Sequence, residues 1–380
     1  MHFWIMKSPS ENNFLELAAP GVRALQPYQP GKPVEELERE FGIRDAIKLA
    51  SNENPFGPSP LAVAAANAVI PTMTRYPEGS GHRLVARLAR RHGVVPECIT
   101  LGNGSNDVLD LVARVFLTPA HEAIYSQHAF AVYPISVQAT GARAQVAPAH
   151  DGSRGPAYGH DLEAMHDRVG PDTRVVFIAN PNNPTGGWLA TDALENFIAA
   201  LPAHVMVVVD EAYFEYVGEP AYPDTTQWLD RFPNLIVTRT FSKAYGLAGL
   251  RVGYALSHPD VAGLLNRVRQ PFNVNLVAQA AALAALDDDA YLASSVSRNR
   301  EGLRQLLDGF SALDLTWIDS VGNFVAVDTG RSAAEVYAAL LREGVIVRPI
   351  ANYAMPNHLR ITVGSNEENA RCLAALGKVL

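Results

Sequence analysis

Six short, continuous apolar runs separated by helical patterns constrain the fold of this chain more than any other feature. The runs are Ile99–Leu101, Ala123–Tyr125, Val175–Ala179, Val205–Val209, Leu235–Val237 and Val252–Leu256. Helical patterns lie between most of them, for example over Val108–Leu117 and Leu194–Leu201. A continuous run, unlike an alternating one, is typical of a strand that is buried on both faces. We therefore predict an α/β domain built on a mainly parallel sheet.

Changes in composition and in hydrophobic pattern divide the chain into three parts. Residues 1–47 are punctuated by prolines and hold one short helical candidate, Val34–Phe41, so we expect an N-terminal arm that forms part of a small domain. Residues 48–270 hold the alternation of strands and helices and form the expected large domain. Residues 271–380 contain a long helical stretch interrupted by the acidic triplet Asp287–Asp289, and they predict a smaller α+β domain.

Composition excludes several classes of protein. The 380 residues are 48% hydrophobic and 18% charged, which is typical of a globular chain. The net charge of −8 provides no basic surface for nucleic acid or an anionic membrane, so any anionic ligand must be held by local arginines. No apolar run reaches the ~18 residues of a membrane-spanning helix, and no signal peptide is apparent. We expect a cytoplasmic protein with two reduced cysteines, Cys98 and Cys372, and no metal site.

The stretch Ile236–Tyr254, IVTRTFSKAYGLAGLRVGY, carries the first candidate for chemistry. Lys243 follows a predicted strand and stands beside hydroxyls and small residues, which suits an amine held in a confined site. Such an amine can form a Schiff base with a carbonyl compound, and pyridoxal 5′-phosphate (PLP) is the commonest one bound to proteins. Thr240 and Ser242 can donate hydrogen bonds to a phosphate, and Arg251 can offer it a planar fork of donors. For a lone Ser-Lys dipeptide, a surface lysine would be the simpler interpretation.

The segment Leu101–Asp107, LGNGSND, follows a predicted strand and opens an amphipathic helix. Its glycines let the backbone approach a phosphate, and the helix N-terminus directs free N–H groups at it. A dinucleotide-binding fingerprint is one alternative, but Asp107 stands where the third glycine of GxGxxG belongs. A plain N-capped turn is the other.

Two further segments end predicted strands. Ala179–Gly186, ANPNNPTG, lies at a carboxyl end, where open α/β sheets bind ligands, and an asparagine there can donate to the phenolate oxygen of PLP. In Val207–Tyr213, Asp210 ends an all-valine strand, where its carboxylate is costly unless it is paired. The protonated pyridine nitrogen is a suitable partner, and Tyr213 can hydrogen-bond the phenolate oxygen. The alternatives are an ordinary turn for the first segment and a helix-capping aspartate for the second.

Together with SNENPFGPSP (51–60), RYPEG (75–79) and LRITVG (359–364), these motifs resemble those of the fold-type-I PLP-dependent aminotransferases. The resemblance covers nearly the whole chain from about Val22 onward, and SNENPFGPS, RYPEG and VRP with LRITVG are most similar to the histidinol-phosphate branch. It implies a large PLP-binding domain with a mainly parallel seven-stranded sheet sandwiched by helices, plus a smaller α+β domain.

The same resemblance assigns cofactor contacts to residues of this sequence. It implies that Lys243 holds PLP covalently and later moves the proton between substrate and cofactor, while Asp210 pairs with the ring nitrogen. Phe130 stands at the position of the aromatic residue that stacks on the ring, where many relatives carry tyrosine. Tyr76 resembles the tyrosine that reaches the phosphate of a neighbouring subunit, which implies a homodimer with shared active sites. The other implied contacts are Asn183, Tyr213, Gly104, Ser105, Asn106, Thr240, Ser242 and Arg251.

The resemblance also implies the substrates. Arg360, in LRITVG, is similar to the arginine that grips a substrate carboxylate or the phosphate of histidinol phosphate, although a surface arginine on a strand is the alternative. Tyr28 and Arg348 resemble residues that line the rest of the substrate pocket, and Asn54 lies in a loop that borders it. The implied reaction is transamination between L-histidinol phosphate and 2-oxoglutarate, which gives imidazole acetol phosphate and L-glutamate in histidine biosynthesis.

Three other functions stay open at this point. An aromatic amino acid aminotransferase uses the same scaffold, and so does a PLP-dependent decarboxylase of phosphorylated amino acids. A PLP-sensing regulator would carry an added DNA-binding segment, and the residues before the core show no basic helix-turn-helix pattern.

Overall fold

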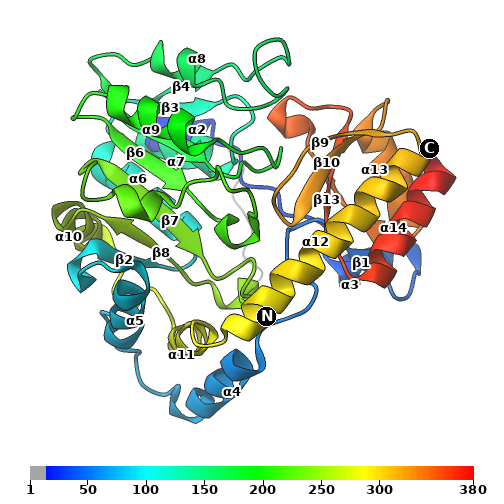
Figure 1. Ribbon diagram of the computed structural model, residues 1–380, viewed down its shortest axis with the longest axis horizontal. Coiled ribbons are helices and arrows are strands. Elements are labelled where there is room, and N and C mark those ends of the chain that lie inside the picture. The colour runs from blue at the N-terminus through cyan, green and yellow to red at the C-terminus, as the bar shows by residue number, and fades with distance from the viewer. Residues whose placement is uncertain (1–13) are drawn as a thin grey trace.

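A seven-stranded sheet forms the centre of the large lobe in the computed structural model, which describes residues 14–380 (Figure 1). The strands lie in the order β2, β8, β7, β6, β5, β3, β4. Their bounds are β2 (Ile99–Gly102), β3 (Glu122–Ser126), β4 (Arg143–Ala147), β5 (Thr173–Ala179), β6 (Met206–Asp210), β7 (Leu235–Thr240) and β8 (Gly253–Ser257). The neighbours from β4 to β7 are parallel, whereas β8 is antiparallel to both β7 and β2. The prediction of a mainly parallel seven-stranded sheet is confirmed.

Helices cover both faces of this sheet because its central strands are apolar on both sides. Val207 and Val209 of β6 pack into one hydrophobic cluster and Val208 into another, as the alternation of side chains along a strand requires. One face carries α5 (His82–His92), α8 (Leu162–His166), α9 (Thr191–Ala200) and α11 (Leu276–Ala285). The other carries α6 (Ser105–Phe116), α7 (Val132–Thr140) and α10 (Pro259–Val268).

The small lobe is built on a four-stranded antiparallel sheet, so the predicted α+β character is confirmed. Its order is β12 (Arg348–Pro349), β13 (His358–Thr362), β10 (Phe324–Asp328) and β9 (Thr316–Ile318). Three helices pack on it, α12 (Asp289–Ala312), α13 (Ala333–Arg342) and α14 (Asn366–Val379). A two-stranded parallel sheet of β1 (Ile47–Lys48) and β11 (Val345–Ile346) ties the arm to this lobe.

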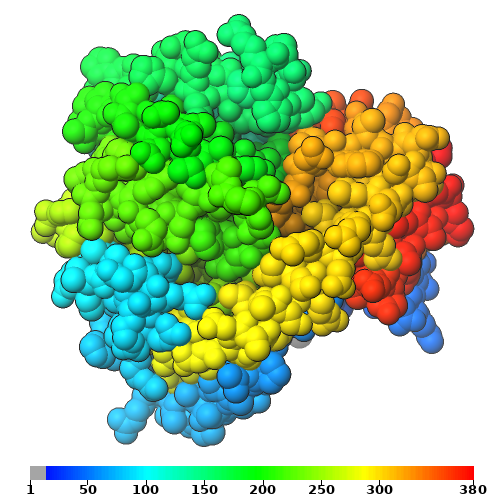
Figure 2. All heavy atoms as spheres, in the orientation of Figure 1, coloured from blue at the N-terminus to red at the C-terminus, as the bar shows by residue number. Residues whose placement is uncertain are grey.

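The N-terminal arm, from residue 14, contains α1 (Phe14–Leu17), α2 (Pro20–Arg23) and α3 (Val34–Phe41). The division of the chain at 47/48 and 270/271 stays a prediction. Beyond the second boundary, α11 still packs on the large lobe, and α12 continues from there to the small lobe (Figure 1). In the space-filling view, the yellow surface of these helices runs between the lobes without a break (Figure 2). Among residues 14–380, no helix combines the length and apolar character that spanning a membrane requires.

Two helix N-caps meet where α12 leaves the large lobe. Ser59 precedes α4 (Pro60–Val69), and its hydroxyl accepts from the backbone N–H groups of Leu61 and Ala62 at 3.1 and 3.3 Å. The same hydroxyl donates to Asp288 Oδ2 at 2.6 Å, and Asp288 caps α12 by accepting from Tyr291 N at 3.1 Å. One serine therefore satisfies the start of α4 and fixes it to the start of α12.

We expect Ser59→Ala to lower the free energy of unfolding by about 1–2 kcal/mol, because a helix cap and a hydrogen bond to a carboxylate are lost together. Urea unfolding of the purified protein measures the change. The matched control is Ser297→Ala on the exposed side of α12, which should change stability by less than about 0.5 kcal/mol. Equal effects of the two substitutions would contradict this account of the joint.

Candidate active site

A cavity of about 160 Å³ lies at the carboxyl ends of β5, β6 and β7, where Ala179, Asp210 and Thr240 line it. The predicted site residues that line it are Tyr28, Ser105, Asn106, Phe130, Asn183, Asp210, Tyr213, Thr240, Ser242, Lys243, Arg251 and Arg360. The predicted residues outside its lining are Gly104, Asn54, Tyr76 and Arg348. The fold thus brings together side chains that are as far apart in sequence as Tyr28 and Arg360.

Asp210 forms one end of the site. Its carboxylate is 4% exposed, and it accepts hydrogen bonds from the hydroxyls of Thr238 at 2.9 Å and Tyr133 at 3.0 Å. Burial raises the pKa of the Asp210 carboxyl, although both hydroxyls and the Lys243 ammonium act in the opposite direction. Because neither of its hydrogen-bond donors carries a charge, a cationic ligand group placed here would be strongly favoured.

Lys243 brings an amine into the same cavity from the turn that follows β7. Its Nζ donates to the carbonyl oxygens of Ser51 and Asn52, each at 3.3 Å, and lies 5.5 Å from the ring centroid of Tyr213. Burial, together with the positive charge of Arg360, lowers the pKa of this amine to about 7. A large share of the amine is therefore neutral near pH 7, which is the form that attacks a carbonyl or accepts a proton.

A set of anion-binding groups forms the other end of the site. Ser105 begins α6, whose first N–H groups have no partner within the helix. Arg251 Nη1 donates to Ser242 Oγ at 3.2 Å, and Ser242 N donates to Thr240 Oγ1 at 3.1 Å. Gly104 has a φ of +83°, and a Cβ atom there would come within 2.4 Å of Arg251 Nη2. Glycine is thus required for the guanidinium to lie beside the helix N-terminus, although Gly104 itself does not line the cavity.

The small lobe contributes Arg360 from β13. Its side chain is 5% exposed, which excludes the alternative of a surface arginine. Nη1 donates to Asn183 Oδ1 at 2.5 Å and Nη2 to the carbonyl oxygen of Ala50 at 2.6 Å, while Nε has no hydrogen-bond partner among residues 14–380. Burial lowers the pKa of Arg360 from its ordinary value. Because Asn183 uses its oxygen to accept from Arg360, its amide nitrogen remains as a donor.

Two residues that the sequence did not single out hold the cavity together. Asn52 is 1% exposed, and its side chain donates to the Tyr213 hydroxyl at 2.9 Å. Tyr133, from α7, is fully buried and donates to Asp210. Asn52 lies inside the motif SNENPFG, two residues before the predicted site residue Asn54, so the motif could have indicated it. Nothing in the local sequence marks Tyr133 as a site residue.

The remaining predicted residues occupy different places. Phe130 lines the cavity and packs edge-on against the Tyr133 ring, with the ring centroids 5.9 Å apart. Asn54 is a link, because its amide donates to the Ala244 carbonyl at 3.0 Å and to Ser295 Oγ at 2.8 Å. Arg348 lies beside the arm, where it donates to the Gln29 carbonyl at 2.6 Å and faces the Tyr28 ring at 5.7 Å.

Tyr76 lies away from this chain's own cavity. Its side chain is 81% exposed and stacks on Phe272 with ring centroids 4.7 Å apart. Within the single chain, Tyr76 is therefore available at the surface.

The donor set fits PLP. A carboxylate without a cationic hydrogen-bond partner suits its ring nitrogen, an amine with a pKa of about 7 suits its aldehyde, and the N-terminus of α6 with Arg251 suits its phosphate. The glycine at position 104 keeps open the approach between that helix and that arginine. The residues around the cavity thus match three polar groups of the cofactor: its ring nitrogen, its aldehyde and its phosphate.

Comparison with known proteins decides the family. The family model for aminotransferase class I and II matches residues 44–376. The chain belongs to the class I and II aminotransferases. Histidinol-phosphate aminotransferase 2 of Methylococcus capsulatus is 60% identical over 96% of this chain and 98% of its own length, and that of Pseudomonas aeruginosa is 60% identical over 97% and 99%. The resemblance to the histidinol-phosphate branch is confirmed.

A solved aminotransferase structure agrees with this assignment. The histidinol-phosphate aminotransferase of Sinorhizobium meliloti, in complex with PLP, has a TM-score of 0.87 and 30% identity and covers 98% of both chains. The chain is therefore an enzyme of the transaminase class with the fold-type-I architecture that the sequence predicted.

The amine of Lys243 makes the stability of the cofactor-free protein depend on pH. Its pKa is about 7 in the folded state and near 10.5 in the unfolded state, so between these values the unfolded chain binds more protons and stability rises with pH. Lys243→Met lacks this group, so the variant should be the more stable protein at about pH 6.5, and its advantage should shrink towards about pH 10. Urea unfolding across this range measures the difference, and a constant difference would contradict the lowered pKa.

Proposed function

We propose that this chain is a PLP-dependent transaminase that transfers the amino group between L-histidinol phosphate and 2-oxoglutarate, giving imidazole acetol phosphate and L-glutamate in histidine biosynthesis. The decisive observation is one cavity that presents Lys243, Asp210 and an anion-binding helix N-terminus, in a chain 60% identical to curated histidinol-phosphate aminotransferases. The aromatic aminotransferase and the phospho-amino-acid decarboxylase are not favoured. The relatives that match this chain over nearly their whole length are named histidinol-phosphate aminotransferases.

Different residues of the cavity bind different parts of the cofactor. In this proposal Asp210 holds the ring nitrogen, Asn183 and Tyr213 donate to the phenolate oxygen, and Phe130 packs on the ring without the hydroxyl that a tyrosine would add. The phosphate is held by Thr240, Ser242, Arg251 and the N-terminus of α6 at Ser105 and Asn106, with Gly104 giving the clearance. When bound, PLP supplies an electron sink that stabilises negative charge at the substrate Cα.

Lys243 is the group that moves the proton. Its amine, once free, is neutral in large part near pH 7, so it can accept the proton from the substrate Cα and return it to the neighbouring carbon. The carbonyl oxygens of Ser51 and Asn52 accept from the amine and hold it in the cavity. This position between the backbone of residues 51–52 and the ring of Tyr213 keeps the base within reach of one face of the bound substrate.

Arg360 has to serve two chemically different substrates. Asn183 and Ala50 anchor its guanidinium, so the fork is fixed before substrate arrives, and Nε has no hydrogen-bond partner in the described part of the chain. A planar guanidinium can hold either the carboxylate of glutamate or the phosphate of histidinol phosphate by paired hydrogen bonds. Arg348 and Tyr28, which lie against each other at the arm, complete the substrate pocket in this proposal.

The proposal includes a cytoplasmic homodimer with shared sites. Tyr76 is exposed and stacked on Phe272, and the neighbouring Met73 is 64% exposed. A tyrosine hydroxyl carried on such an apolar surface suits an interface with a second copy of the chain. We propose that Tyr76 reaches the phosphate end of the partner's cavity.

The first test compares substrates in the purified protein. We expect kcat/KM for L-histidinol phosphate with 2-oxoglutarate to exceed that for L-phenylalanine by at least about tenfold, because its phosphate offers Arg360 and Arg348 more charge and more acceptor oxygens than the carboxylate of phenylalanine does. Turnover of phenylalanine equal to or faster than that of histidinol phosphate would instead support the aromatic aminotransferase. A phosphothreonine-like substrate serves as the control for decarboxylation.

Shared sites can be tested by mixing two inactive variants. We expect Tyr76→Ala and Lys243→Ala each to lose most activity as pure proteins. After dissociation and reassociation together, one site of each mixed dimer combines the intact Lys243 of one chain with the intact Tyr76 of the other, so about a quarter of wild-type activity should return. Mixing Lys243→Ala with Asp210→Ala is the control and should restore nothing, since both residues belong to one chain's cavity. No recovery in the first mixture would contradict shared sites.

A further inference from the structure

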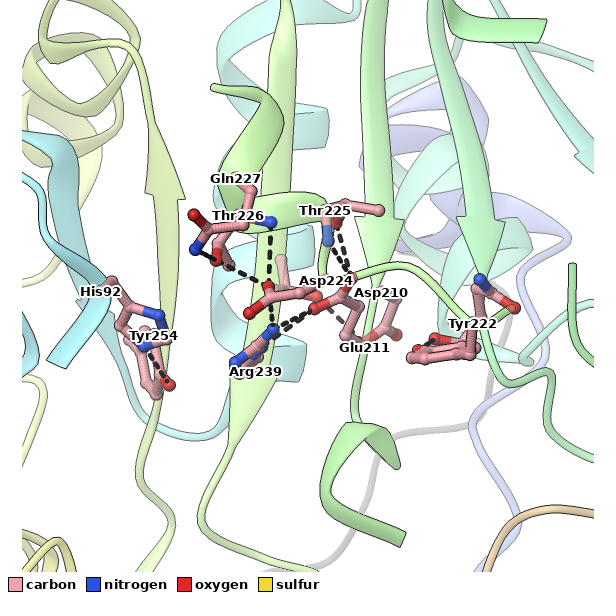
Figure 3. A network of polar contacts seen from close by, with 12 residues as sticks. His92, Asp210, Glu211, Tyr222, Asp224, Thr225, Thr226, Gln227, Arg239 and Tyr254 are labelled. Atoms are coloured by element: carbon pink, nitrogen blue, oxygen red, sulfur yellow. Dashed lines mark hydrogen bonds and ion pairs between the residues drawn. The ribbon is translucent and has the colours of Figure 1, made fainter. Parts of the chain in front are cut away.

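A largely buried ion cluster around Arg239 joins four segments of the large lobe (Figure 3). Arg239 Nε and Nη2 donate to Glu211 Oε2 at 2.9 and 2.7 Å, and Nη2 also donates to Asp224 Oδ1 at 2.6 Å. The ring of Phe214 lies over the guanidinium, with 3.5 Å from Cζ to the ring centroid. β7, the end of β6, the residues after Tyr213 and the loop at Asp224 are thus held by one side chain.

The Glu211 carboxylate is fully engaged within this cluster. While Oε2 accepts from Arg239, Oε1 accepts from Thr225 N at 3.1 Å and from Thr225 Oγ1 at 2.6 Å. The Glu211 side chain has no exposed surface, and that of Arg239 is 5% exposed. A pair this buried loses the hydration of both charges, and an apolar pair of similar size is often as stable or more so. Stability alone therefore does not account for it.

The cluster lies directly behind the residues that face the cofactor. β6 pairs with β7 so that Asp210 lies opposite Thr238, and Glu211 N donates to the Thr238 carbonyl at 2.9 Å. Side chains alternate along a strand, so Thr238 and Thr240 share one side of β7 and Arg239 occupies the other. On the cavity side Thr238 donates to Asp210, and on the other side Arg239 donates to Glu211. The same two strand ends are therefore fastened from both faces.

We propose that Arg239 and Glu211 are positioning residues of the transaminase: their forked ion pair sets the spacing between the ends of β6 and β7, and so fixes where Asp210 and Lys243 face the cofactor. The inference rests on the proposed function. Two donors of one planar guanidinium, Nε and Nη2, meet on Glu211 Oε2, and this fixes the direction of the guanidinium in a way that a rotating lysine ammonium cannot. Small displacements of groups around a reacting centre are costly for rate, so a rigid link at this point acts on catalysis.

The chain offers a matched control for this pair. Arg143, at the start of β4, also joins two carboxylates, Glu122 at 3.2 Å and Asp172 at 2.8 Å. Its side chain is 50% exposed, and it lies at the amino ends of the strands, away from the cavity lining. Arg143→Lys therefore makes the same chemical change in a similar bridge that does not support the site.

The experiment compares Arg239→Lys, Glu211→Gln and Arg143→Lys with the wild-type holoenzyme. PLP is removed, its Kd is measured by absorbance titration at a temperature where each cofactor-free protein is fully folded, and kcat and KM are measured after reloading. We expect the two cluster variants to raise the Kd for PLP and to lower kcat, each by about tenfold or more, with KM for histidinol phosphate within about threefold of wild type. Arg143→Lys should have the same Kd for PLP, kcat and KM as the wild-type enzyme.

The outcomes separate positioning from a general structural role and from failure of the proposed function. A wild-type Kd and kcat in both folded cluster variants would overturn the inference while leaving the proposed function intact. A rise in KM as large as the fall in kcat would also overturn it, since it would indicate a site that is loosened throughout. If wild-type protein itself does not bind PLP, the proposed function fails and the inference fails with it.

Discussion

A carboxylate buried beside an amine is the constraint on which the rest of this structure depends. Asp210 ends a strand of valines and is held by two neutral hydroxyls, while Lys243 enters the same cavity with a pKa lowered to about 7 by burial. A ligand that places a cation beside the carboxylate would offset the cost of burying it, and the neutral amine is the form that reacts with an aldehyde. The sheet, the small lobe and the arm together hold these two groups in the lining of one cavity.

Much of the fold follows from burial patterns in the sequence. Strands at the centre of the sheet are continuous apolar runs, and α3 begins and ends where the sequence predicted. The edge strand β4, Arg143–Ala147, was not predicted because one side of it is open to solvent and its residues are largely exposed, so it forms no continuous apolar run. The helix α7 escaped for a different reason: VYPISVQAT combines a proline with β-branched residues, and only its packing against the sheet stabilises a helix there.

The site was predictable where a motif ends a strand, and less so where tertiary structure assembles it. Asp210, Asn183 and the Thr240–Lys243 turn line the cavity because the carboxyl ends of parallel strands meet at one edge. Tyr133 reaches Asp210 from a distant segment that no local pattern marks, whereas Asn52, which donates to Tyr213, lies inside the SNENPFG motif. Asn54 proves to be a link to Ala244 and Ser295, and Tyr76 is exposed outside the chain's own cavity, so its contact with a phosphate stays a proposal. The Arg239 cluster likewise requires the register of β6 and β7.

The most direct measurement is to add PLP to the purified protein, reduce it with borohydride and map the labelled peptide by mass spectrometry. Reduction fixes the cofactor on whichever lysine carries it. The account predicts a single label on Lys243 in wild-type protein, with much weaker labelling in an Asp210→Ala variant that remains folded. Labelling spread over exposed lysines such as Lys378, or label on Lys243 that does not depend on Asp210, would contradict a site in which these two groups face the same ligand.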